Sequence, residues 1–260
     1  MAEDVPAKGD ELPADNDAVN DELKQEQTVD DADVVVQSKK DKKCKRALLI
    51  VDMQYDFMPP NGSLQVSGGD KIVKVVNDIR DKYGSKFDEV ICSMDWHPKT
   101  HCSFIDNNIK RVPTAKAFSL CKLENGNDQM MWPVHCVQGS KGAKIHKDLT
   151  RSQSDKIILK GMDPSVDSYS AFMDNDKQTK TAMEGLLKEA EITDIFCVGL
   201  AYDYCVGWTA LDGKALGFNS YVIKDASASV SSESEVEREQ QMKDAGVNII
   251  KVSDLENLLK

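Results

Sequence analysis

The stretch DWHPKTH, from Asp95 to His101, places one carboxylate and two imidazoles within seven residues. If the chain is extended there, Asp95 and His97 point the same way, and a turn just after them brings His101 back. A third imidazole, His135, follows in the segment WPVHC, so this set uses three of the four histidines of the chain. One carboxylate and three imidazoles suit a divalent cation: we expect Zn²⁺, with Fe²⁺ or Mn²⁺ as alternatives. The simpler interpretation is a pair of loop histidines satisfied by backbone groups.

A second reactive feature is Cys205, which precedes the apolar, small-residue run VGWTAL over residues 206–211. That run predicts a helix, and a thiol at a helix N-terminus is favoured as the thiolate. The free N–H groups there can also hold an oxyanion formed when the sulfur attacks a carbonyl. The seven cysteines include no CxxC pair, so neither a disulfide framework nor a structural zinc site is indicated. Cys205 is therefore the candidate nucleophile.

A thiol at neutral pH needs a proton acceptor, and the metal set leaves no histidine for that task. Asp52 ends the first apolar run of the chain and is the available base. Lys160 ends the third run, where it would neutralise the acid and the thiolate and hold the geometry. Taken singly, each has a simpler interpretation, because strand-ending Asp and Lys residues are usually solvated. Together with Cys205 they form a candidate catalytic triad.

The elements that must position these groups are short apolar runs that alternate with helical patterns. Helical stripes follow Gly68 and precede Glu191, and Ser232 with Glu235 forms a candidate capping box for a helix that stops at Gly246. This alternation predicts one α/β domain, a three-layer sandwich with a six-stranded, mainly parallel sheet between helices. Ligands then bind at the carboxyl ends of the strands, and the long segment 98–150 folds over that site. The six predicted strands cover residues 47–51, 89–94, 156–160, 195–199, 220–223 and 247–250.

The charge of the chain is unevenly placed. The net charge is −11, and residues 1–38 carry twelve acidic residues against Lys8 and Lys24. A basic cluster follows over residues 39–46, and we interpret residues 1–44 as a disordered acidic arm before a domain over 45–260. The cluster is either a localisation signal or a solubilising hinge.

Composition also excludes several classes of protein. No apolar run approaches a membrane span and the first residues lack the pattern of a secretory signal, so we expect an intracellular, cytoplasmic protein, with nuclear entry as the alternative. An acidic body repels phosphate backbones, which argues against nucleic acid as a partner. The apolar helix faces permit a homo-oligomer.

Five motifs resemble the nicotinamidases, of the isochorismatase-like cysteine hydrolases. In chain order they are IVDMQYDF from residue 50, DWHPKTH from 95, WPVHCVQG from 132, KG at 160 leading to YSAF at 169, and VGLAYDYCV from 198. The resemblance runs from about Ala47 to the C-terminus. The acidic arm falls outside it, and the loop 161–168 is a little longer than in short bacterial members.

The resemblance implies roles for these residues. It gives Asp52, Lys160 and Cys205 as the triad, the backbone N–H groups of Ala201 and Cys205 as the oxyanion hole, and a cis peptide at Leu200–Ala201. It implies a metal site made by Asp95, His97, His101 and His135. It also implies that Phe57, Trp132 and Tyr169 form an aromatic slot for a flat pyridine ring.

The activity implied is hydrolysis of nicotinamide to nicotinate and ammonia through a cysteine thioester, which serves NAD salvage. One alternative is a related amidohydrolase that acts on another small amide, and the metal ligands argue against it. The other is a non-catalytic, metal-binding regulatory protein, for which an activated thiol would have no use.

Overall fold

A computed structural model describes residues 44–110, 112–123 and 126–260 of the chain. The predicted acidic arm, except Cys44, lies outside the described residues, as does the basic cluster up to Lys43.

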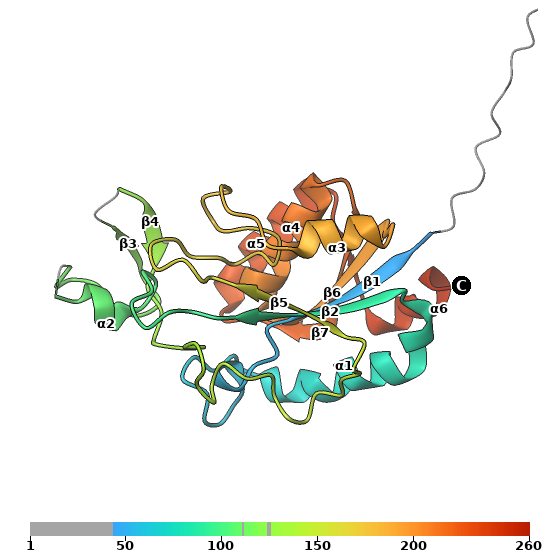
Figure 1. Ribbon diagram of the computed structural model, residues 1–260, viewed down its shortest axis with the longest axis horizontal. Helices are drawn as coiled ribbons and strands as arrows, with labels where there is room; N and C mark the ends of the chain where they lie inside the picture. The colour runs from blue at the N-terminus through green and yellow to red at the C-terminus, as the bar shows by residue number, and fades with distance from the viewer. Residues whose placement is uncertain (1–43, 111, 124–125) are drawn as a thin grey trace, which may run out of the picture. The chain divides into compact units, whose positions relative to one another are not determined.

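A six-stranded sheet forms the centre of the described domain (Figure 1). Each neighbouring pair is parallel, in the order β5-β2-β1-β6-β7-β8, so the predicted parallel sheet is confirmed. The strands form where continuous apolar runs occur, because such runs can be buried on both faces. Their bounds are β1 Arg46–Val51, β2 Glu89–Asp95, β5 Lys156–Lys160, β6 Asp194–Leu200, β7 Asn219–Ala228 and β8 Asn248–Ile250.

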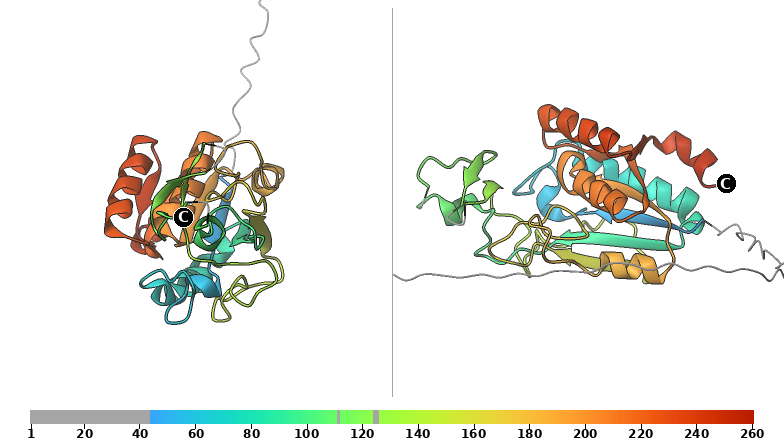
Figure 2. Two further views of the ribbon diagram at one scale, coloured as in Figure 1. Left: turned by 90° about the vertical axis from the view of Figure 1, so that its left-hand side faces the viewer. Right: turned by 90° about the horizontal axis from the view of Figure 1, so that it is seen from above.

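Helices cover both faces of the sheet, which gives three layers (Figure 2). Along β1 the side chains alternate between two cores: Leu48 and Ile50 belong to one, Leu49 and Val51 to the other. The first core also contains residues of α1 (Gly69–Tyr83) and α6 (Leu255–Leu258). The second contains residues of α3 (Met183–Glu189), α4 (Gly207–Ala215) and α5 (Ser232–Asp244). The predicted three-layer sandwich is confirmed.

The segment between β2 and β5 is long and carries little regular structure. It contains α2 (Ile105–Asn108) and a small antiparallel pair, β3 (Leu120–Lys122) with β4 (Asp128–Met130), which extend beyond one end of the sheet (Figure 2). A single bridge of Gln54 with Ile145 connects it to the loop after β1, and two more, His97 with Val137 and Phe104 with Trp132, join parts of the segment to each other. The segment lies over that end of the sheet, because its His135 approaches Asp95 at the end of β2.

The N-terminus of α5 differs from the expected capping box. Ser231, one residue earlier than predicted, is the N-cap, and its side chain accepts a hydrogen bond from the backbone N–H of Ser234. The carboxylate of Glu235 accepts from the Ser229 hydroxyl instead of reaching back to the cap. Two neighbouring serines can each serve as a cap, so the sequence alone did not separate them. The predicted stop at Gly246 agrees with its left-handed φ of 75° just after the helix.

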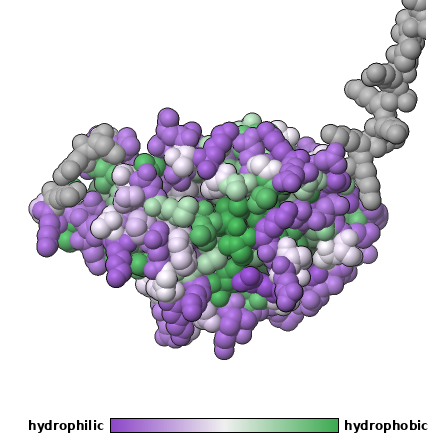
Figure 3. Space-filling model, viewed as in Figure 1, coloured by the Kyte–Doolittle hydropathy of each residue, from purple (hydrophilic) through white to green (hydrophobic). Residues whose placement is uncertain are grey.

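The face shown in Figure 3 is mostly polar, with an apolar area in its middle near the edge strand β5. Exposed apolar residues in that part of the chain include Ile157 and Met162. Among the described residues, no helix combines the length and apolar character that a membrane crossing requires.

Candidate functional site

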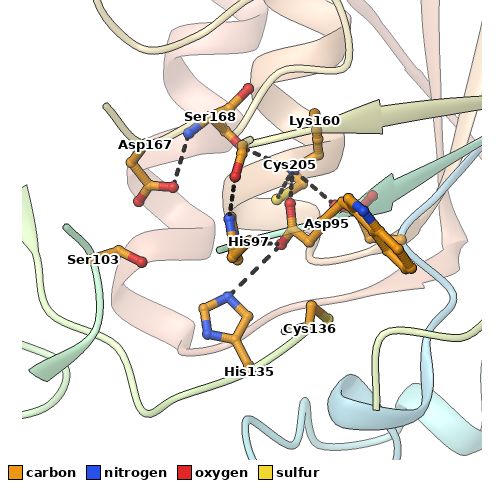
Figure 4. Close-up of polar contacts among 12 residues, drawn as sticks. Asp95, His97, Ser103, His135, Cys136, Lys160, Asp167, Ser168 and Cys205 are labelled. Atoms are coloured by element: carbon orange, nitrogen blue, oxygen red, sulfur yellow. Dashed lines mark hydrogen bonds and ion pairs between the residues drawn. The ribbon is translucent and has the colours of Figure 1, made fainter. Parts of the chain in front are cut away.

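The carboxyl ends of β1, β2, β5 and β6 meet at one edge of the sheet, where Lys160 connects the charged groups (Figure 4). Its Nζ lies 3.0 Å from Oδ2 of Asp52 and 2.5 Å from Oδ1 of Asp95. The same Nζ donates to the Ser168 carbonyl at 2.8 Å and reaches Sγ of Cys205 at 3.3 Å. Burial alone would lower the pKa of Lys160, but the two carboxylates outweigh it and hold that pKa well above its usual value. Lys160 is thus a buried, charged link between the candidate base and the candidate nucleophile.

Asp52 is fully buried directly after β1. Its Oδ1 accepts from the Ser93 hydroxyl at 2.6 Å, whereas its Oδ2 forms the 3.0 Å ion pair with Nζ of Lys160. A carboxylate oxygen of Asp52 lies within 4.8 Å of the Cys205 sulfur. Burial raises the pKa of Asp52 to about 6, with Lys160 acting in the opposite direction. This places a buried carboxylate with a raised pKa beside the thiol, as a general base requires.

Cys205 lies within a single π-turn, Tyr202–Val206, that leads directly into α4. Burial raises the pKa of Cys205 well above its usual value despite the nearby Lys160, which agrees with the expectation that the thiol needs a proton acceptor. The resting thiol keeps its proton. Attack by the sulfur therefore needs simultaneous transfer of that proton to a base.

The backbone before the nucleophile has the conformation that the resemblance implied. The Leu200–Ala201 peptide is cis, and the Ala201 carbonyl accepts hydrogen bonds from the N–H groups of Tyr204 and Val206. Ala201 and Cys205, whose N–H groups are the expected oxyanion hole, both line the same pocket.

Three of the four expected metal ligands come together. Asp95, His97 and His135 are buried and offer ligand atoms that all lie within 4.8 Å of one another. Oδ2 of Asp95 lies 3.5 Å from Nε2 of His97 and 3.8 Å from Nε2 of His135. The Nδ1 atoms lie 2.8 Å from the carbonyls of Gly161 and Pro133, which leaves each Nε2 facing the carboxylate. The donor set is that of a zinc-type site with room for further ligands.

His101 lies outside that group, in contrast to the expectation. Its ring stacks on His97 with 4.0 Å between centroids, its Nδ1 pairs with the Ser103 hydroxyl at 2.8 Å and its Nε2 lies 3.3 Å from the Val166 carbonyl. It forms a second group of potential ligands with His97 and Asp167. The tight turn after Pro98 brings His101 beside His97 and not beside Asp95.

The charge states of these groups follow from burial and from their neighbours. Burial, together with the adjacent His97, lowers the pKa of His101 and of His135 to about 4, so both imidazoles are neutral near pH 7. Burial favours a raised pKa for Asp95, but Lys160 and His97 outweigh it and hold its pKa well below the usual range. A neutral His135 beside an ionised Asp95 has the protonation state that a metal ion binds. Burial would lower the pKa of His97, but Asp95 outweighs it and raises that pKa, so a metal ion would displace a proton from this imidazole.

Gly161 illustrates how closely the site is packed. Its φ is 65°, and a Cβ atom placed there would lie 2.4 Å from Cε1 of His97. A side chain at this position would displace the imidazole, so the glycine after Lys160 is required by both conformation and space.

Sequence reasoning missed the residues that hold Asp95 and His135. The buried side chain of Gln54 donates to the Asp95 carbonyl and accepts from the Asp95 N–H, each at 2.8 Å. The Asp56 carboxylate accepts from the N–H of Cys136, next to His135, at 2.7 Å. In the sequence, Gln54 and Asp56 are polar residues next to a buried strand, and this does not reveal which residues they contact.

The site opens into a pocket of about 390 Å³, part of it open to solvent. Phe57, Trp132 and Tyr169, the expected aromatic residues, all line it, and the Trp132 indole N–H donates to the Tyr169 hydroxyl at 3.4 Å. Tyr204 packs edge-on against Trp132 with 4.9 Å between centroids. The pocket therefore combines apolar, aromatic walls with polar groups at one end, as small-molecule sites do. Sequence reasoning missed five further lining residues, namely Leu64, Val66, Asp167, Tyr204 and Val230.

Residues 46–254 match the family model described as the isochorismatase domain. The chain belongs to the isochorismatase family. One curated relative is the nicotinamidase of Acinetobacter baylyi, 40% identical over 205 residues, which are 78% of this chain and 91% of the relative.

Two solved structures connect the family to ligands. PnC1 from L. infantum in complex with nicotinate is 34% identical with a TM-score of 0.69, covering 80% of this chain and 93% of that one. The pyrazinamidase of Pyrococcus horikoshii in complex with zinc is 31% identical with a TM-score of 0.65, covering 80% and 99% respectively. In this chain, the candidate metal group and the aromatic pocket lie side by side.

Proposed function

We propose that this protein is a nicotinamidase, which hydrolyses nicotinamide to nicotinate and ammonia. The observation that carries the proposal is the contact of Lys160 with both Asp52 and Cys205 at one end of an aromatic pocket. Nicotinate formed in this way is a precursor for NAD salvage, and the nicotinamidase relative supports this assignment.

In the first half of the reaction, the Cys205 sulfur attacks the carboxamide carbon while its proton passes to the carboxylate of Asp52, which has an oxygen within 4.8 Å of that sulfur. Lys160 stays charged and stabilises the anionic sulfur as it forms. The oxyanion of the tetrahedral intermediate is received by the N–H groups of Ala201 and Cys205.

In the second half, the proton held by Asp52 is given to the leaving nitrogen and ammonia departs. This leaves a nicotinoyl thioester on Cys205. Asp52, ionised again, takes a proton from water as that water attacks the thioester carbon. The proton then passes from Asp52 to the departing sulfur, which restores the thiol, and the nicotinic acid formed ionises to nicotinate.

We propose that Asp95, His97 and His135 hold one divalent metal ion, with Zn²⁺ supported by the donor set and by the zinc-bound relative. His101 and Asp167 lie next to this group and are placed to contact water or further ligands around it. When bound, the metal supplies a Lewis acid that orients the pyridine nitrogen and polarises the substrate. The side chains of Phe57, Trp132 and Tyr169 sandwich and align the flat ring.

The test is ammonia release from nicotinamide by the purified protein, before and after treatment with a metal chelator. We expect rapid release that chelation abolishes and that added Zn²⁺, Fe²⁺ or Mn²⁺ restores. Release from a different small amide, with none from nicotinamide by the metal-loaded protein, would overturn the substrate assignment but leave the thiol chemistry intact.

A further inference from the structure

Asp203, two residues before Cys205, is fully buried and is not used by the mechanism above. Its carboxylate accepts hydrogen bonds from the N–H groups of Val230 at 3.0 Å and Ser231 at 3.1 Å, and from the Ser234 hydroxyl at 2.5 Å. All three donors lie in the connection from β7 to α5 or in the first turn of α5. The side chain of Asp203, in the turn that carries Cys205, thus binds the connection from β7 to α5 and the first turn of α5.

The backbone of the same turn is fixed to α5 as well. Nε of the buried Arg238 donates to the Asp203 carbonyl at 2.9 Å, and its guanidinium lies 4.1 Å from the centroid of the Trp208 ring. Gly207 permits this approach, because a Cβ atom there would lie 2.5 Å from Cγ of Arg238. The Tyr202 hydroxyl also donates to Glu239, at 3.2 Å. The turn is therefore bound to α5 on both sides of Asp203.

Val230 connects this arrangement to the substrate. Its side chain lines the pocket together with Ala201 and Cys205, while its N–H donates to Asp203. The distance between the Val230 wall and the Cys205 turn thus depends on a charge-assisted hydrogen-bond cluster, which is stronger and more directional than neutral hydrogen bonds.

We propose that Asp203 is a positioning residue that fixes the Val230 wall relative to Cys205 and thereby sets how tightly the pocket fits the ring of its substrate. The choice of ring substrate rests on the proposed nicotinamidase function. The positioning role itself rests only on the contacts of Asp203.

The matched variants are Asp203→Ala and Asp212→Ala. Asp212 is also a buried acid of this region and accepts from Lys177 at 2.7 Å, but it does not line the pocket. We expect Asp203→Ala to raise KM for nicotinamide about tenfold, the loss of roughly one charge-assisted hydrogen bond, with a smaller change in kcat. Asp203→Asn keeps the shape but only part of the acceptor capacity, so it should raise KM in the same direction by a smaller factor. Asp212→Ala should keep KM within about twofold whatever it does to stability.

A ring with an extra methyl group separates positioning from general destabilisation. The ratio of kcat/KM for nicotinamide to that for 5-methylnicotinamide should fall by about fivefold in Asp203→Ala, because a loosened wall admits the larger ring. The same ratio should be unchanged in Asp212→Ala. Unchanged KM and an unchanged ratio in Asp203→Ala would overturn the proposal.

Two further variants and one chemical probe keep the test decisive. If Asp203→Ala does not fold, Asp203→Asn and Ser234→Ala should still shift the ratio in the same direction, and no shift in either overturns the proposal.

If the wild-type protein does not hydrolyse nicotinamide, the proposed function fails. The role of Asp203 is then tested by iodoacetamide alkylation of Cys205, followed by mass spectrometry of the peptide that carries Cys205. Alkylation should be about fivefold faster in Asp203→Ala than in Asp212→Ala, because loosening the turn exposes a buried thiol; equal rates would overturn the positioning role.

Discussion

The floor of the pocket and its cover are built differently. Asp52 and Lys160 stand at the ends of β1 and β5, and Cys205 lies in the turn that follows β6. Backbone hydrogen bonds of the sheet fix the separation of those strand ends. His101 and His135 come instead from the segment between β2 and β5, which single bridges, scattered backbone hydrogen bonds and side-chain contacts hold in place. The order of the strands fixes which strand ends are neighbours, whereas a long loop can place its side chains in several ways.

That difference explains what the sequence could predict. The apolar runs predicted all six strands of the main sheet, and therefore where Asp52, Asp95 and Lys160 would meet. Spacing alone put His101 with Asp95, but the turn after Pro98 stacks its ring on His97. Side-chain contacts across the fold, such as those of Gln54 with Asp95, leave no periodic signal and were not predictable.

The largest effect is expected at the floor. Cys205→Ala should reduce ammonia release by at least about 10³-fold, because the nucleophile is lost while the pocket remains. Cys197→Ala is the matched control, since Cys197 is a buried cysteine of β6 that lies outside the pocket. Its turnover should stay close to that of the wild type. Full turnover by Cys205→Ala would eliminate the covalent mechanism.

Removing the charge of Lys160 tests how far the floor depends on it. Lys160→Met leaves the buried carboxylates of Asp52 and Asp95 without their shared cation. We expect the free energy of unfolding to fall by about 3–5 kcal/mol, measured by urea denaturation, and turnover to be lost. Stability within about 1 kcal/mol of the wild type would mean that the ion pairs contribute little.

The cover is tested by comparing two of its histidines. His135→Ala removes a member of the group with Asp95 and His97 and should lower metal affinity by about 10–100-fold, measured by titration with Zn²⁺. His101→Ala, which leaves that group intact, should have a clearly smaller effect. Equal losses in the two variants would place His101 among the ligands and restore the expectation from spacing.

The smallest and most gradual effect is that of pH. Burial raises the pKa of Asp52 to about 6, and the base must be ionised to accept the thiol proton. The value of kcat/KM should therefore be level above about pH 7 and fall toward tenfold per unit below pH 6. Circular dichroism over the same range would confirm that the protein remains folded. A level profile down to about pH 5 would exclude Asp52 as the base.

The most direct test of the central claim is an acid quench of the enzyme during turnover of nicotinamide, followed by mass spectrometry. A thioester on Cys205 predicts a peptide carrying residue 205 that is heavier by one nicotinoyl group, present at early times and lost as substrate is exhausted. Active enzyme that never shows this adduct, even in an Asp52→Asn variant slowed at both steps, would contradict the account.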